Sequence, residues 1–179
     1  MILEKLESRK KKKKVLENAS KYYGFKEELK KYDLRLSGRD VFLLDNELGR
    51  FLDSLPNDLK EKIVHAGIKV GEVGRKFRFS LEGSFFLIKK EKKKVYIDRK
   101  AEMLFLYGRD VFSKSILKAT ADIKENDIVF VCNLYGDVIG IGKAKYSAKD
   151  ITRLGEKVVV YNLIDRGEYL RKEKLYKSF

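Results

Sequence analysis

The sequence predicts an α+β protein in which an N-terminal α/β domain, residues 1–93, packs on a C-terminal β pseudo-barrel, residues 94–179. Helical and strand patterns mix in the first half, whereas the second half consists mainly of short β runs with glycine turns. Between them, residues 89–94 are almost wholly cationic and contain no glycine-, proline- or serine-rich linker. We therefore expect two domains that pack closely.

The first half begins with a long helical pattern. Apolar side chains recur at helical intervals over residues 2–32, and Gly24 is expected to end or bend this helix. Alternating runs at 33–36 and 40–44 flank a glycine turn and predict a hairpin. The remaining expected elements are helices at 46–55 and 56–65, the second with Ser54 as N-cap and Pro56 in its first turn, strands at 68–70 and 76–79, and a helix at 81–89.

The second half is expected to be mostly β-structure. Its apolar runs predict strands at 95–97, 103–107, 128–134, 138–146 and 157–161, with a short helix or loop at 108–118. Gly140 and Gly142 are two residues apart, so in a strand both face the same side. Two interpretations stay open: a bare face that lets RNA or another backbone approach, or a bend of the barrel.

The charge of the chain predicts the class of its partner. The 179 residues include 41 Lys and Arg against 27 Asp and Glu, a net charge of +14. This excess favours a polyanion, because lysines and arginines near phosphates release condensed counterions. The alternative is a soluble protein whose surface is merely basic. Six consecutive cations, Arg9–Lys14, could track phosphates or form a solvated patch, and their mutual repulsion favours fraying of a helix there.

Few residues could support catalysis or metal binding. Cys132 and His65 are the only residues of their kinds, which excludes an intramolecular disulfide and an ordinary zinc site within these residues. No P-loop motif occurs, and His65, expected in a helix, could be a surface or core residue instead of a catalytic one. We expect no enzyme activity, cofactor or metal. Without a signal peptide or a long apolar run, a soluble cytoplasmic protein is expected.

Three blocks in the second half together resemble a known family. They are AEMLFLYGR at 101–109, GDVIGIG at 136–142 and DRGEYLR at 165–171, and their order and spacing resemble the Nip-seven family of ribosome-assembly proteins. The first half is similar to it mainly through residues 63–67 and 76–79. The resemblance implies an archaeal member whose N-terminal α/β domain packs on a C-terminal PUA domain, a β pseudo-barrel that binds structured or single-stranded RNA.

The resemblance also implies a function. It implies a non-catalytic, monomeric RNA-binding factor in large-subunit biogenesis and pre-rRNA processing, with U-rich RNA, assembly factors or the exosome as partners and no membrane. In a eukaryotic source, the protein would be nuclear or nucleolar. Two alternatives stay open: an RNA-modification enzyme or its accessory subunit, since PUA domains are often joined to such catalysts, and an adaptor that docks acidic proteins.

The sequence departs from the family's pattern where RNA contacts are expected. The loop that in many PUA domains has a glycine is Ser113–Ile116 here, and residues 158–164, before the last block, are mostly apolar. Lys157 is the only clear basic match there. We therefore expect nearby cations to bind RNA, in two groups that converge into one patch: Lys145, Lys149, Arg153, Lys157, Arg166, Arg171 and Lys172.

Overall fold

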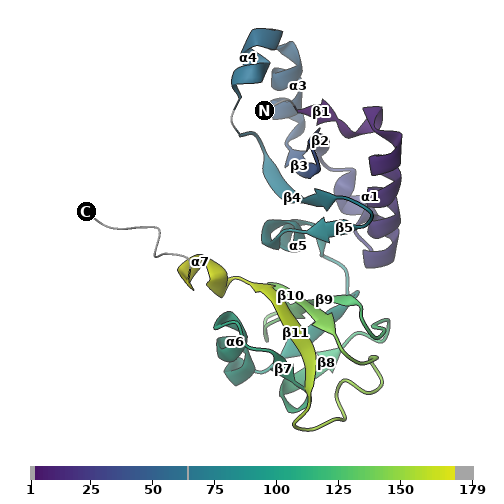
Figure 1. Cartoon of the computed structure of the whole chain (residues 1–179), viewed down its shortest axis with the longest axis vertical. Helices are drawn as coiled ribbons and strands as arrows, with labels where there is room; N and C mark the ends of the chain where they lie inside the picture. The colour runs from purple at the N-terminus through teal and green to yellow at the C-terminus, as the bar shows by residue number, and fades with distance from the viewer. Residues whose placement is uncertain (1–2, 64, 172–179) are drawn as a thin grey trace, which may run out of the picture. The chain divides into compact units, whose positions relative to one another are not determined.

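The computed structural model describes residues 3–63 and 65–171, and the chain forms two compact units, Met1–Lys90 and Glu91–Phe179 (Figure 1). The first unit mixes strands and helices, and the second is built mainly of strands. The α+β class expected from the sequence is therefore confirmed. The expected domain boundary between residues 93 and 94 stays a prediction: residues 94–179 are expected to fold as an isolated fragment.

The first unit contains a five-stranded antiparallel sheet in which every strand pairs with its neighbour in the chain. Its strands are β1 (Glu4–Lys5), β2 (Asp33–Ser37), β3 (Asp40–Leu44), β4 (Ile68–Val73) and β5 (Phe77–Phe79). The expected hairpin is confirmed: Ser37 pairs with Asp40 across a two-residue turn of Gly38 and Arg39. Gly38 has φ +56°, a conformation that glycine adopts without strain and that such tight turns require.

Helices occupy the segments between and after these strands. They are the 3-10 turn η1 (Leu6–Ser8), α1 (Lys10–Tyr23), α2 (Lys26–Leu29), α3 (Asn46–Ser54), α4 (Asn57–Lys62) and α5 (Leu81–Leu87). The single helix expected over residues 2–32 is wrong at both ends, because Glu4 and Lys5 pair with β2 and Gly24 separates α1 from α2. Gly24 ends α1 as expected, in a left-handed conformation with φ +82°. The lysines after Arg9 are helical, so repulsion among them does not unwind the first turns of α1.

Two expectations around α4 are wrong. Ser54 is the last residue of α3 and its hydroxyl donates to the carbonyl oxygen of Phe51, so it caps no helix; Pro56 occupies the N-cap position of α4. His65 lies beyond the end of α4, exposed, with its ring edge-on to Phe42. The first error arises because α3 extends through Ser54, and the second because α4 ends at Lys62.

The second unit is built on a six-stranded mixed sheet in the order β7-β11-β10-β9-β6-β8. The strands are β6 (Lys94–Ile97), β7 (Val111–Phe112), β8 (Ile116–Ala119), β9 (Ile128–Cys132), β10 (Val138–Ala144) and β11 (Val158–Asp165). Only the β6–β9 pair is parallel. The two outer strands, β7 and β8, are joined by one turn, η2 (Ser113–Ser115), so the edges of the sheet are held near each other. The sheet therefore curves into the nearly closed barrel that was expected.

Two helices complete the second unit, α6 (Arg99–Leu106) and α7 (Gly167–Arg171). The strand expected at 103–107 is wrong, because these residues belong largely to α6. Asp98 caps this helix by accepting a hydrogen bond from the Ala101 amide at 2.8 Å. The apolar run at 103–107 fits a strand as well as a helix, so this cap was not recognised from the sequence. Residues 108–118, expected as a helix or loop, instead contribute β7, η2 and part of β8.

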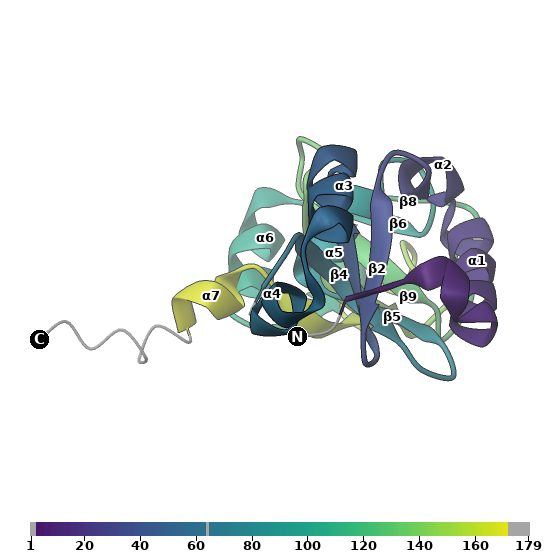
Figure 2. The same ribbon diagram turned by 90° about the horizontal axis from the view of Figure 1, so that it is seen from above.

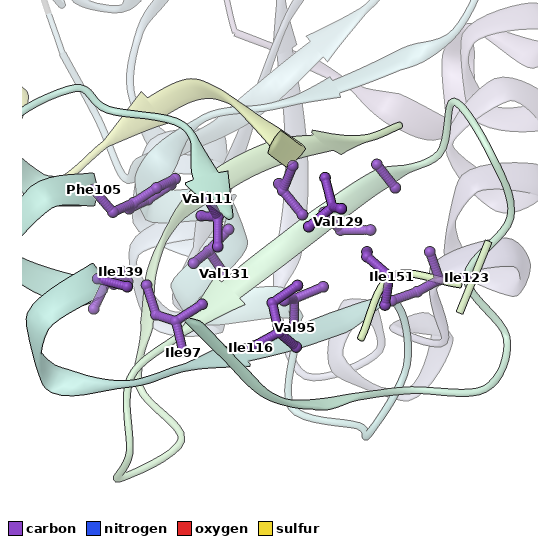
Figure 3. Packing of buried hydrophobic residues seen from close by; sticks show 14 residues of the cluster. Val95, Ile97, Phe105, Val111, Ile116, Ile123, Val129, Val131, Ile139 and Ile151 are labelled. Carbon is purple, nitrogen blue, oxygen red and sulfur yellow. The ribbon is translucent and has the colours of Figure 1, made fainter. Parts of the chain in front are cut away.

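The interior of the barrel is largely aliphatic, with the ring of Phe105 among the aliphatic side chains (Figure 3). Its buried side chains come from every strand of the sheet, from α6 and from the connection after β10; they include Val95, Phe105, Val111, Ile116, Val129, Ile139, Ile151 and Val159. Gly140 and Gly142 are covered by this packing. A Cβ atom at Gly140 would lie 2.6 Å from the Phe105 ring, and β10 has a bulge between Ile141 and Gly142. Of the two interpretations of these glycines, the barrel bend is therefore the right one.

Candidate nucleic-acid interface

The connection between β10 and β11, residues 145–157, is a long loop with a fixed backbone. The side chain of Ile151 is completely buried in the barrel core. The Ile151 amide donates to the Ser147 carbonyl, and the Ala148 amide donates to the Ile123 carbonyl, both at 3.0 Å. A buried anchor in the middle of the loop leaves its polar residues on the outside, so we call residues 145–157 the cationic loop.

The second half of the cationic loop is held by η2. The Ser113 amide donates to the Lys157 carbonyl, and the Lys114 amide donates to the Gly155 carbonyl, both at 2.9 Å. The buried Ser113 hydroxyl accepts from the Leu154 amide at 2.9 Å. Ser113, which lies in the loop where many PUA domains have a glycine, therefore fixes the cationic loop in place.

Four of the expected RNA-binding cations lie on the cationic loop, and all four are exposed: Lys145, Lys149, Arg153 and Lys157. Within residues 3–63 and 65–171, none of them forms an ion pair; the nearby pair joins Lys114 to Glu156 at 2.8 Å. Exposed cations without a carboxylate partner remain available to an external anion. All four therefore lie exposed on this one loop, and their contact with RNA stays a prediction.

The cationic loop also adjoins aromatic rings. The ammonium of Lys145 lies 5.6 Å from the ring centre of Tyr161 on β11 and 5.8 Å from that of Tyr146. The Tyr161 hydroxyl beside it raises the pKa of Lys145. Tyr161 is 39% exposed, so a base could stack on its accessible surface while Lys145 contacts the neighbouring phosphate. Tyr161 was not expected as a contact, since only the strand register shows which side of β11 faces outward.

The other group of expected contacts lies elsewhere. Lys157 precedes β11, whereas Arg166 and Arg171 follow it, and the eight residues of this strand span roughly 25 Å. The expected convergence of the two groups into one patch is therefore wrong, because an extended strand separates them. Arg166 is half-buried and its amide donates to the Ile139 carbonyl at 2.9 Å. Lys172 lies outside the described residues.

Arg171 is engaged inside the unit. Its guanidinium forms two hydrogen bonds, at 2.9 and 2.8 Å, with the carboxylate of Asp165, a residue only 1% exposed. It also donates to the Leu106 carbonyl at the end of α6. Asn162 donates to the same carboxylate at 2.9 Å and to the Phe105 carbonyl at 2.8 Å. Arg171 therefore ties α7 to β11 and to the end of α6, and its side chain already has an anionic partner.

The thiol of the second unit is masked by burial. Burial raises the pKa of the Cys132 thiol to about 12, so this thiol is protonated at neutral pH. Across the described residues, no group of three or more His, Cys, Asp and Glu side chains is arranged to hold a metal ion. The same residues include no helix both long and apolar enough to cross a membrane.

The barrel with its preceding unit defines the class of protein. Residues 93–174 match the UPF0113 PUA domain, and residues 5–82 match the NIP7/UPF0113 pre-PUA domain. The fold is also that of a conserved PUA domain protein from Thermoplasma acidophilum, with a TM-score of 0.63, 18% identity, and coverage of 90% of this chain and 92% of that chain. A hypothetical protein from Pyrococcus horikoshii gives the same TM-score at 20% identity, over 94% of this chain and 99% of that one.

Sequence relatives identify the family. A UPF0113 protein of Archaeoglobus fulgidus is 44% identical over 170 residues, which cover 93% of this chain and 94% of that protein. A protein of Xenopus tropicalis, named a 60S ribosome subunit biogenesis protein NIP7 homolog, is 30% identical over 90% of this chain and 93% of its own length. The chain therefore belongs to the NIP7/UPF0113 family, which confirms the resemblance seen in the sequence. The eukaryotic relatives are named as biogenesis proteins and not as enzymes.

Proposed function

We propose that this protein is a non-catalytic RNA-binding factor in large ribosomal subunit assembly, and that the cationic loop of its PUA unit holds the RNA. The observation that carries this proposal is the loop itself, where four exposed cations, which pair with no carboxylate among the described residues, stand on a fixed backbone beside Tyr161. The net charge of +14 and the names of the eukaryotic relatives support it. The finer parts of the proposal are a role in pre-rRNA processing, modulation of the exosome, and a monomeric protein in the cytoplasm.

The mode of binding follows from the residue types. Lys149, Arg153 and Lys157 would contact phosphates, which fixes position without reading sequence. Lys145 and Tyr161 would hold one nucleotide by its phosphate and its base, an arrangement that suits single strands because their bases can be unstacked. U-rich RNA is the preferred ligand in this proposal. Arg171, which is held by Asp165, would support the fold at the other end of β11 and would not contact the RNA.

The test is a comparison of two variants with the same loss of charge. The loop variant replaces Lys149, Arg153 and Lys157 by alanine, and the control variant replaces three exposed cations of the same unit, Arg99, Lys100 and Lys124. Affinity for a U-rich oligonucleotide is measured at several salt concentrations. We expect the loop variant to lose about 10- to 100-fold and its salt slope to flatten by about two units, since each phosphate contact contributes about 0.7 to the slope.

The control variant should lose only the smaller affinity that follows from its reduced net charge. If both variants bind equally well, the cationic loop is not the site and RNA is held through overall charge. If the loop variant binds as tightly as the unchanged protein, the RNA lies elsewhere on the molecule.

The enzyme alternative has a separate test. Incubation of the protein with RNA and S-adenosylmethionine, or with RNA alone, is expected to yield neither methylated nor cleaved RNA. A product that disappears when one polar side chain is replaced would show that the protein acts on its RNA and does not only bind it.

A further inference from the structure

The N-terminal unit has a second cationic surface, at the end of its sheet where two hairpin turns lie next to each other. One turn joins β2 to β3 through Gly38 and Arg39, and the other joins β4 to β5 through residues 74–76. The Val73 amide donates to the Arg39 carbonyl at 2.8 Å, which links the base of the second turn to the first. The two turns lie at the same end of the sheet (Figure 2).

These turns enclose a hollow whose lining is almost entirely cationic. It has a volume of ≈ 580 Å³ and is lined by Arg39, Gly74, Arg75, Lys76 and Arg78. The four charged residues are all exposed. Arg78 pairs with Glu72 at 3.1 Å, but the other three form no ion pair with any residue that the structure describes. We call this surface the hairpin hollow.

The basic run at the start of α1 adjoins the hairpin hollow. The ammonium of Lys12 donates to the Gly38 carbonyl at 2.5 Å, so the first turns of α1 lie against the β2–β3 turn. Arg9 is occupied by Glu4, with nitrogen–oxygen distances of 2.6 and 2.9 Å. Within the run Arg9–Lys14, two members are therefore engaged with the protein, and Lys12 fixes the turn that presents Arg39.

We propose that the hairpin hollow binds the phosphate backbone of RNA, as a second contact surface besides the cationic loop; this rests on the proposed function only in that the ligand is RNA. Among the residues that the structure describes, those that line the hollow include no carboxylate and no aromatic ring, which suits phosphates and offers no platform for a base. Arginine presents a planar fork of donors that matches phosphate oxygens in pairs, and two of the three uncompensated cations are arginines. The hollow therefore recognises backbone charge and not sequence.

The experiment uses the full chain with Arg39→Gln, Arg75→Gln and Lys76→Gln as the hollow variant. The matched control replaces three other exposed cations of the same unit, Lys26, Arg50 and Lys62, by glutamine. Each is also combined with the alanine loop variant described above. Affinity for a structured rRNA fragment is measured against salt, and thermal unfolding shows that each variant is folded.

We expect the hollow variant to bind the fragment about three- to tenfold more weakly, with a salt slope lower by about two units, and the control to change far less. The loss should be similar in the presence and in the absence of the loop substitutions. A variant that keeps the charge, Arg39→Lys with Arg75→Lys, should lose less affinity than the hollow variant does, because lysine retains the charge but not the planar fork of donors.

The outcomes separate the two proposals. If the loop variant loses RNA and the hollow variant behaves as its control does, the hairpin hollow is overturned and the proposed function stands. If only the hollow variant loses RNA, the hollow is supported and the cationic loop fails. If the hollow substitutions weaken binding of polyglutamate but not of RNA, the surface serves an acidic protein and the proposal is overturned.

Discussion

The two ends of β11 carry similar cations with different roles. Before the strand, Lys149, Arg153 and Lys157 are exposed and form no ion pair within the described residues. After it, Arg171 is held by the carboxylate of Asp165, which is almost completely buried. A buried carboxylate needs a partner, because burying an uncompensated charge is costly. The comparison teaches that a basic residue becomes a candidate for RNA binding only after its partners within the protein are known.

The largest expected effect is on stability, at the C-terminal end of β11 where Arg171 pairs with Asp165. Arg171→Met leaves the Asp165 carboxylate without its main partner and removes a hydrogen bond to the end of α6. Loss of one partner of a pair whose carboxylate is buried is destabilising, so we expect Arg171→Met to unfold at a clearly lower urea concentration than the unchanged protein. Urea unfolding measures the difference, with Arg153→Met as the control that should stay within about 0.5 kcal/mol. Equal stability of the two variants would mean that Asp165 does not depend on Arg171.

The next prediction tests whether β10 is tightly packed at Gly140, next to Asp165. Gly140 pairs with Asp165 across the sheet, and a Cβ atom there would meet the Phe105 ring and the Ile164 carbonyl, each at 2.6 Å. Gly140→Ala should therefore destabilise the protein by about 1–3 kcal/mol. Gly74→Ala is the control, since its Cβ would meet only the Lys76 carbonyl at 3.8 Å. Thermal unfolding distinguishes them; a stable Gly140→Ala protein with weakened RNA binding would favour the open-face interpretation instead.

A smaller effect concerns base stacking on Tyr161, next to the cationic loop. Tyr161→Ala removes the ring beside Lys145, and loss of one stacked base should weaken binding of a U-rich oligonucleotide about fivefold to tenfold. The salt slope should not change, because no phosphate contact is lost. Tyr161→Phe keeps the ring and should bind nearly as the unchanged protein does. A loss of the same size with phenylalanine would assign the effect to the hydroxyl and its contact with Lys145.

The smallest effect is that of a single phosphate contact. Lys149→Ala should weaken RNA binding by roughly 1 kcal/mol or less, no more than about fivefold, and should flatten the salt slope by about 0.7. Lys124→Ala, also exposed and in the same unit, is its control. A single change at Lys149 that abolished binding would indicate a specific, buried contact and not a diffuse backbone surface.

The barrel could largely be predicted from the sequence, because β9 and β10 have strong apolar runs with a glycine turn between them. Helix α6 could not, since eight residues with an apolar end fit a strand as well as a helix, and only the cap at Asp98 distinguishes them. The cations of the cationic loop were proposed as RNA contacts from the sequence, because they directly follow a strand that its apolar run marks clearly.

The roles of two other residues depend on tertiary structure. The pairing of Arg171 with Asp165 requires the turn between β11 and α7, and no local pattern in the sequence marks it. The outward orientation of Tyr161 depends on the register of β11 against β10, which shifts at a bulge. The hairpin hollow escaped sequence analysis for the same reason, since its cations come from two turns more than thirty residues apart.

The central claim is that RNA contacts one end of β11 and not the other. The most direct measurement is a titration of the isotopically labelled full chain with a U-rich oligonucleotide, followed by the shifts of its backbone amide resonances in NMR spectra. The account predicts that the largest shifts within the PUA unit fall in residues 145–157 and at Tyr161, while those at residues 165–171 stay near their starting positions. Large shifts at residues 165–171 with an unchanged cationic loop would contradict it.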